Sequence, residues 1–205
     1  MKILKQNQLD EAAKLLKEGK VIAFPTETVY GLGVVYDNQK AYDRLCEVKR
    51  RPPEKPFTLM LADVKDVDKY AELNKEAKAL VKAFMPGQFT IITKAREGLP
   101  SWCVSNTGNV GIRIADYDLI RDLIRKTGKP LLVPSANRSG EKPATTTEEV
   151  IEAFGEELEA VVEGKSISNI PSTIIYVGDE YSDVFREGAV KIENIKRVIL
   201  EAKQI

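Results

Sequence analysis

The stretch VIAFPTETVYGLG, residues 21–33, decides the fold class of this chain. Its first four residues are apolar and a proline follows them, the pattern of a short buried strand that ends in a turn. Apolar residues recur at helical spacing on both sides, which predicts one helix over residues 8–18 and a second over residues 39–48. A buried strand between two amphipathic helices is typical of an α/β domain.

The rest of the chain repeats this alternation of short apolar runs and helical patterns. Further strands are predicted over residues 57–61, 89–93, 110–114, 131–134, 160–164 and 172–177, and further helices over residues 75–84, 117–127, 146–153 and 193–203. Because several strands follow one another without a helix, we expect a mixed sheet. We also expect one domain over residues 1–205, since no Gly-, Ser- or Pro-rich linker divides the chain.

The composition excludes several classes of chemistry. The chain contains no histidine, which removes Ser-His-Asp and Cys-His nucleophiles, imidazole bases and histidine-bound zinc. Its 31 basic and 31 acidic residues balance, so no overall field attracts nucleic acid or an anionic membrane. No apolar run approaches the length of a membrane span and no secretory signal precedes the first helix, which predicts a cytoplasmic protein with no membrane partner.

The turn after the first strand offers the hydroxyls of Thr26 and Thr28, and two glycines, Gly31 and Gly33, that let a backbone approach a ligand closely. It matches neither the P-loop nor the dinucleotide-binding glycine motif. Two interpretations stay open: the hydroxyls contact a ligand, or one of them caps a helical turn.

Cations gather at the end of the second predicted helix, where Lys49, Arg50 and Arg51 precede Pro52 and Pro53. The helix dipole favours positive charge at this end, which already explains a solvated cluster. The prolines also stiffen the exit, so Lys49 and Arg51 could instead converge on a triphosphate. Both interpretations stay open.

Arg113 stands in the predicted strand VGIRI, residues 110–114. Alternation along the strand points Val110, Ile112 and Ile114 into a core and leaves Arg113 on the other face beside Gly111. An arginine with space around it is typical of a cleft that receives an anion. The alternative is an edge-strand arginine that discourages aggregation.

Ser135 and Asn137 follow another predicted strand, where they could donate to a ligand or make ordinary Ser and Asx turns. Arg186 stands at a strand exit near the end of the chain, after Ser172 begins the strand before it. Cations and hydroxyls with few general bases favour electrostatic stabilisation of a polyanion, as in nucleotidyl or phosphoryl transfer.

Five motifs in this order and spacing resemble the YrdC family of threonylcarbamoyl-AMP synthases. They are FPTETVYGLG, Lys49-x-Arg51-Pro52, VGIRIA, PSANRSG, and PSTII with Arg186-x-Gly188, and the resemblance covers about residues 8–190. The resemblance implies a twisted mixed sheet with flanking helices around a large basic cavity. It also implies a nucleotidyltransferase that joins L-threonine, bicarbonate or CO2, and ATP, releasing pyrophosphate in the first step of tRNA threonylcarbamoyladenosine formation. It further implies the short, single-domain form.

The resemblance also implies roles for individual residues. Lys49 and Arg51 would be catalytic and bind the ATP phosphates, with Ser135, Asn137 and Arg186 also on the nucleotide; Thr26, Arg113 and Ser135 would bind threonine. Mg2+ would come with ATP, and no metal ligand is expected from protein side chains. A downstream tRNA threonylcarbamoyl transferase would receive the product, and direct contact with tRNA is left open.

Two departures from the family pattern affect these assignments. Residues 142–145 read KPAT where many relatives read PSPT, so a serine hydroxyl is missing. Whether Thr145 or Thr146 takes its place stays open. Some relatives carry a histidine near Met60, which this chain lacks. Two loops are candidates for a lid over the site, residues 97–108 and residues 164–172.

Two other functions remain possible from sequence alone. The first is a YrdC-like module that binds RNA without catalysis, although few cations are clustered for backbone binding. The second is an O-carbamoyl-adenylating domain of hydrogenase-maturation proteins. Those domains sit beside acylphosphatase and zinc modules, neither of which this sequence contains.

Overall fold

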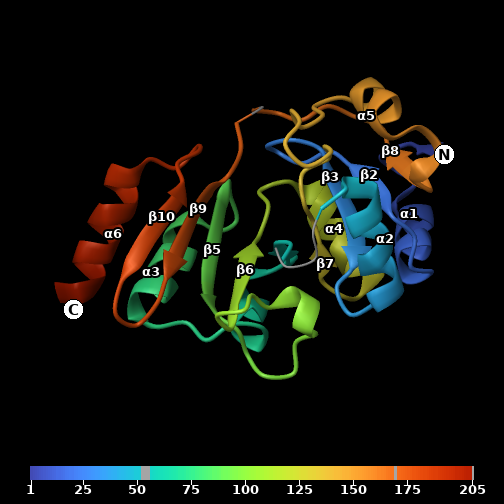
Figure 1. The fold of residues 1–205 in the computed structure, drawn as a ribbon. Helices are drawn as coiled ribbons and strands as arrows, with labels where there is room; N and C mark the ends of the chain where they lie inside the picture. The colour runs from blue at the N-terminus through green and yellow to red at the C-terminus, as the bar shows by residue number, and fades with distance from the viewer. Residues whose placement is uncertain (52–55, 169, 205) are drawn as a thin grey trace.

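The computed structural model describes residues 1–51, 56–168 and 170–204, which form a ten-stranded mixed sheet with flanking helices (Figure 1). This confirms the predicted α/β class. The strands are β1 (Lys2–Leu4), β2 (Ile22–Phe24), β3 (Gly31–Val35), β4 (Leu59–Met60), β5 (Phe89–Lys94), β6 (Asn109–Arg113), β7 (Leu131–Leu132), β8 (Ala160–Val162), β9 (Thr173–Val177) and β10 (Ser182–Arg186). The α-helices are α1 (Leu9–Lys17), α2 (Gln39–Lys49), α3 (Lys75–Phe84), α4 (Asp118–Thr127), α5 (Thr147–Phe154) and α6 (Ile192–Gln204).

The strand order is β1-β8-β2-β3-β7-β4-β6-β5-β9-β10. The sheet contains parallel pairs (β1–β8, β2–β8, β4–β6, β5–β9) as well as antiparallel ones, which confirms the predicted mixed sheet. Figure 1 shows two halves, with β5, β6, β9, β10, α3 and α6 on one side and β2, β3, β8, α1, α2 and α5 on the other. In the described part of the chain, no helix is both long and apolar enough to cross a bilayer.

Two hydrophobic clusters cover the two faces of the sheet. Along β2, Ile22 and Phe24 belong to the cluster that contains the buried residues of α1 and α4, whereas Ala23 belongs to the other cluster. This split follows from the two-residue period of a strand. A strand whose two faces are both covered by helices carries apolar residues on both faces. This explains the short continuous apolar runs in the sequence.

Two strands were not expected from the sequence, β1 and β3, and β10 was expected only as a strand that ends near Arg186, without bounds. In β3 the two glycines obscured the pattern, because glycine weakens a strand signal. They serve packing: a Cβ on Gly33 would lie 2.4 Å from the Phe24 ring, and one on Gly31 would lie 2.6 Å from Cγ1 of Val133. The expectation that both glycines admit a ligand is therefore wrong for Gly33, while Gly31 also lines the cavity described below.

Candidate active site

A cavity of about 520 Å³ opens between the two halves of the sheet. Among the described residues its lining comes from strands and loops, with no residue from a helix and no carboxylate. Five of the predicted site residues line it: Thr26, Arg51, Arg113, Ser135 and Arg186. Three arginines and several hydroxyls around such a space make a site for an anionic ligand.

The hydroxyls of Thr26 and Thr28 hold the turn that connects β2 to β3. Thr26 Oγ1 accepts a hydrogen bond from the backbone nitrogen of Thr28 (3.2 Å) and donates to the carbonyl oxygen of Val29 (2.7 Å). Thr28 Oγ1 lies 3.0 Å from Thr26 Oγ1 and donates to it, since the Thr26 proton is already used. The turn runs directly from strand to strand, so the helix-cap interpretation is wrong. Both threonines line the cavity.

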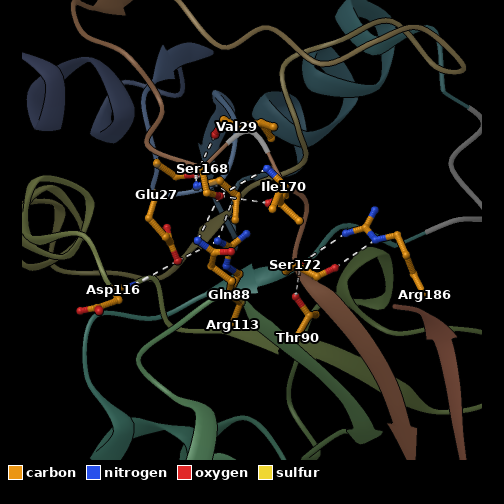
Figure 2. Close-up of polar contacts among 12 residues, drawn as sticks. Glu27, Val29, Gln88, Thr90, Arg113, Asp116, Ser168, Ile170, Ser172 and Arg186 are labelled. Carbon is orange, nitrogen blue, oxygen red and sulfur yellow. Dashed lines mark hydrogen bonds and ion pairs between the residues drawn. The ribbon is translucent and has the colours of Figure 1, made fainter. Parts of the chain in front are cut away.

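Arg113 ends β6, which lies between β4 and β5, so the edge-strand interpretation is wrong. As predicted, Val110, Ile112 and Ile114 are in the core, and Arg113 faces the cavity with Gly111. The structure also gives Arg113 two partners. Its Nη2 atom lies 2.8 Å from Oε1 of Glu27 and donates to Oγ1 of Thr28 at 3.0 Å (Figure 2 shows the Glu27 contact).

Arg186 is held on the other side of the cavity by Ser172. Its Nε donates to the Ser172 carbonyl oxygen at 3.0 Å and its Nη2 to Ser172 Oγ at 3.3 Å (Figure 2). Ser172 Oγ in turn lies 3.0 Å from Oγ1 of Thr90. Burial, and then the positive charge of Arg113, lower the pKa of Arg186. The Ser172 groups that hold Arg186 are neutral, so they do not offset its charge. An anion bound between Arg113 and Arg186 would therefore be favoured.

Lys49 is 2% exposed, so the interpretation as a solvated helix end is wrong for this residue. Its Nζ donates to the carbonyl oxygens of Ser135 (2.5 Å) and Asn137 (2.8 Å). Burial, and then the charge of Arg51, lower the pKa of Lys49 to about 8. Lys49 is not among the described residues that line the cavity, because its ammonium group is directed into the loop after β7.

Arg51 lines the cavity beside the aromatic ring of Phe57, with its guanidinium carbon 4.9 Å from the ring centroid. Its Nη2 donates to the carbonyl oxygen of Pro56 at 3.3 Å. Burial lowers the pKa of Arg51. The expected stiffening by Pro52 and Pro53 lies outside the described residues.

Ser135 and Asn137 form a local network with one another. Ser135 Oγ donates to Oδ1 of Asn137 at 2.6 Å, and Asn137 Nδ2 donates to the carbonyl oxygens of Arg138 (2.7 Å) and Glu141 (3.0 Å). Ser135 also lines the cavity, whereas Asn137 is not among its described lining residues. The Asx-turn interpretation therefore describes the side chain of Asn137, and Ser135 can serve both as a turn residue and as a ligand.

The residues that depart from the family pattern also have defined places. Thr146 caps α5 by accepting from the nitrogen of Glu149 (3.2 Å), and Thr145 donates to the Glu149 carboxylate (2.9 Å). Neither threonine is in the described lining, while Met60 is. Both lid candidates contribute to the lining, the first through Ser105 and the second through Ser172.

Two kinds of site residue were missed. Glu27 lies between Thr26 and Thr28, and the signal that could have identified it is a lone carboxylate in a turn next to a buried strand. Thr90 lies on β5 opposite Arg113, and the period of two in FTIIT would have placed it on the same face. Within the described residues, no group of three or more His, Cys, Asp or Glu side chains could hold a metal ion.

Comparison with known proteins gives concordant matches. The family model Sua5_yciO_yrdC, described as telomere recombination, matches residues 14–188. A threonylcarbamoyl-AMP synthase of Bacillus subtilis is 35% identical over 94% of this chain and 56% of that protein. One of Vibrio campbellii is 36% identical over 80% of this chain and 91% of that protein. The crystal structure of P. abyssi Sua5 complexed with L-threonine matches with a TM-score of 0.92 at 30% identity, over 97% of this chain and 61% of that chain. The chain thus spans little more than half the length of the B. subtilis relative.

Proposed function

The chain belongs to the Sua5/YciO/YrdC family, and from this membership we propose that it synthesises threonylcarbamoyl-AMP from L-threonine, bicarbonate or CO2, and ATP, releasing pyrophosphate. The family resemblance drawn from the five motifs is thereby confirmed. The observation that carries the proposal is the cavity itself. It places Arg51, Arg113 and Arg186 around one space in a fold whose neighbour of known structure holds L-threonine.

The carboxylate of threonine is assigned to Arg113, with Thr26 and Ser135 beside it. A guanidinium suits this role because it matches the planar geometry of a carboxylate. Arg51 and Arg186 are assigned to the phosphates of ATP, and Lys49 supports them from the loop that carries Ser135 and Asn137. The two substrates would then meet between Arg113 and Arg186.

The reaction proceeds in two bond-forming steps. The threonine amine attacks CO2: an N–C bond forms, the electrons of one C=O π bond move to oxygen, and the amine proton passes to solvent, which gives a carbamate. A carbamate oxygen then attacks the α-phosphorus of ATP in line, and the bond to the leaving pyrophosphate breaks. Because the carbamate is already an anion, the second step needs no base, in agreement with a cavity lining whose described residues contain no carboxylate. The arginines offset negative charge as it develops on the leaving group.

Several components of the proposal rest on the family alone. Mg2+ would be carried in on the phosphates of ATP and offset their charge, since the described cavity lining offers it no carboxylate. The product is labile and would pass to a tRNA threonylcarbamoyl transferase in the cytoplasm, where ATP and tRNA are available. The similarity to threonylcarbamoyl-AMP synthases favours catalysis over the RNA-binding alternative.

A pyrophosphate-release assay with ATP, L-threonine and bicarbonate, each omitted in turn, tests the function. Mass detection of threonylcarbamoyl-AMP identifies the product. We expect release only when all three are present. Release without threonine, or none with all three, would contradict the proposal. RNA binding that weakens steeply with salt and does not respond to threonine would support the alternative.

A further inference from the structure

The turn between β2 and β3 carries a buried carboxylate, that of Glu27, which is not among the described residues of the cavity lining. Glu27 is 4% exposed, and its Oε1 atom lies 2.8 Å from Nη2 of Arg113, which is itself 8% exposed. A buried ion pair is a weak source of stability, because removing both charges from water costs about as much as their attraction returns. The position of this pair, one residue from Thr26 and directly behind the cavity wall, points to another role.

Glu27 is fixed by backbone groups from two distant segments (Figure 2). The nitrogen of Asp116, just after β6, donates to Oε1 of Glu27 at 3.2 Å. The nitrogen of Ser168, in the segment before β9, donates to the carbonyl oxygen of Glu27 at 3.0 Å. The first bond holds the carboxylate through Oε1 and the second holds the backbone of the same residue, while within the described residues Oε2 is buried without a hydrogen-bond partner. Oε1 therefore has a set position before any ligand binds, which is the requirement for preorganising a second group.

The consequence for Arg113 is that its two terminal nitrogens differ. Nη2 is occupied by Glu27 and Thr28 together. Within the described residues, Nε is buried with no hydrogen-bond partner and Nη1 donates to no protein group. Since Arg113 lines the cavity, Nη1 is the terminal nitrogen that remains for a ligand.

We propose that Glu27 is a positioning residue: it fixes Nη2 of Arg113 against the cavity wall so that Nη1 is presented to the carboxylate of the amino-acid substrate. The inference rests on the proposed function, in which Arg113 binds that carboxylate. Glu27 acts through Arg113 and does not touch the substrate. Its loss should therefore weaken recognition of threonine and leave recognition of ATP unchanged.

Steady-state kinetics of the full chain test whether recognition of threonine and recognition of ATP respond differently to the loss of Glu27. E27Q keeps the size of the side chain and removes its charge. We expect it to raise KM for threonine on the order of 10-fold to 100-fold, as misplacing a binding group does, with KM for ATP changed by less than about twofold. The matched control is E157Q, which removes the charged partner of another buried arginine, Arg138; neither residue is among the described residues of the cavity lining. It should leave both constants unchanged. Equal changes in both constants for E27Q, or none in a folded protein, would overturn the proposal.

A second measurement does not depend on activity. Nitrogen-15 NMR of arginine side chains reports whether rotation of a guanidinium is restricted. We expect separate Nη signals for Arg113 in the wild type and a single averaged signal in E27Q, with the Arg186 signals unchanged. Failure of the wild type to release pyrophosphate would defeat the proposed function but not this result. Identical Arg113 signals in the two proteins would overturn the positioning role, and E27D replaces E27Q in both tests if E27Q does not fold.

Discussion

The ammonium group of Lys49 lies 2.5 Å from the carbonyl oxygen of Ser135, which is 86 residues further along the chain. This contact joins the end of α2 to the loop after β7, and so links two of the five motifs that identify the family. A charged lysine directed at neutral carbonyl oxygens fixes the shape of the loop, but it lacks the compensation that a carboxylate would give. Two properties follow, a lowered pKa and a pH-dependent stability.

Stability should depend on the protonation of Lys49. Its folded-state pKa is about 8, below the unfolded value of 10.5. Below about pH 8 both states are protonated, and the folded state bears the full cost of the buried charge. Between about 8 and 10.5 the unfolded state binds more protons, so stability rises with pH. Urea denaturation at about pH 7 and pH 10 should show the wild type gaining on the order of 1–3 kcal/mol relative to Lys49→Met. A difference that does not vary with pH would contradict this assignment.

The two arginines that face each other across the cavity should separate the two substrates kinetically. Arg113→Gln should raise KM for threonine, and Arg186→Gln should raise KM for ATP, each on the order of 10-fold to 100-fold, the value of a hydrogen bond between charged groups. Initial rates of pyrophosphate release against each substrate measure both constants. If Arg113→Gln changed only the ATP constant, the assignment of the carboxylate to Arg113 would be wrong.

Gly111 should tolerate a side chain structurally but not functionally. A Cβ there would meet only ordinary contacts, the nearest at 3.7 Å from Cγ1 of Ile92. The residue faces the cavity between Asn109 and Arg113. Gly111→Leu should therefore fold with stability equal to or up to about 1 kcal/mol above the wild type, since glycine weakens a strand. Its side chain should occupy the cavity and lower kcat/KM at least about tenfold.

Thermal unfolding and pyrophosphate release, measured on the same preparation, check both parts of the Gly111 prediction. Gly111→Ala is the matched control, because its single methyl group fills little of a cavity of about 520 Å³. It should retain most of the activity. Full activity in Gly111→Leu would show that the ligands do not use this part of the cavity floor.

The sequence predicted the helices and the core strands well because periodicity and apolar content determine them locally. The alternation in VGIRI correctly placed Arg113 on the face opposite Ile112. The strand β3 was missed because its glycines are required by contacts with Phe24 and Val133, which the local pattern does not reveal. The exposed edge strand β10 lacked a strong apolar signal for a related reason, since only one of its faces packs on the protein.

The partners of the site residues could not be predicted in the same way. Glu27 meets Arg113 only because β2 and β6 are brought together by strands between them in the sheet. Ser172 holds Arg186 through the β9–β10 pairing, which is again a long-range relationship. Residue types indicated an anion site, whereas the direction of each charged group depends on the tertiary structure. The burial of the Lys49 side chain is the clearest example, because a lysine at the end of a helix is expected to be exposed to solvent.

The two threonines of the turn should differ in what their hydroxyls do. Thr26 serves the backbone of the turn, accepting from the nitrogen of Thr28 and donating to the oxygen of Val29. Thr26→Val removes the hydroxyl from the nitrogen of Thr28 and the oxygen of Val29. Losing these two hydrogen bonds should lower the free energy of unfolding by about 1–3 kcal/mol. Thr28 accepts from Arg113, so Thr28→Val should cost about 1 kcal/mol and raise KM for threonine several-fold.

Urea denaturation and threonine kinetics of the two variants check this difference. The control is Thr127→Val, because Thr127 is also buried and donates only to the carbonyl oxygen of Leu123 within α4. It should lower stability by about 1 kcal/mol and leave KM for threonine unchanged. If Thr28→Val behaved like this control, the hydroxyl would have no part in holding Arg113. The turn would then position the ligand through Thr26 and Glu27 alone.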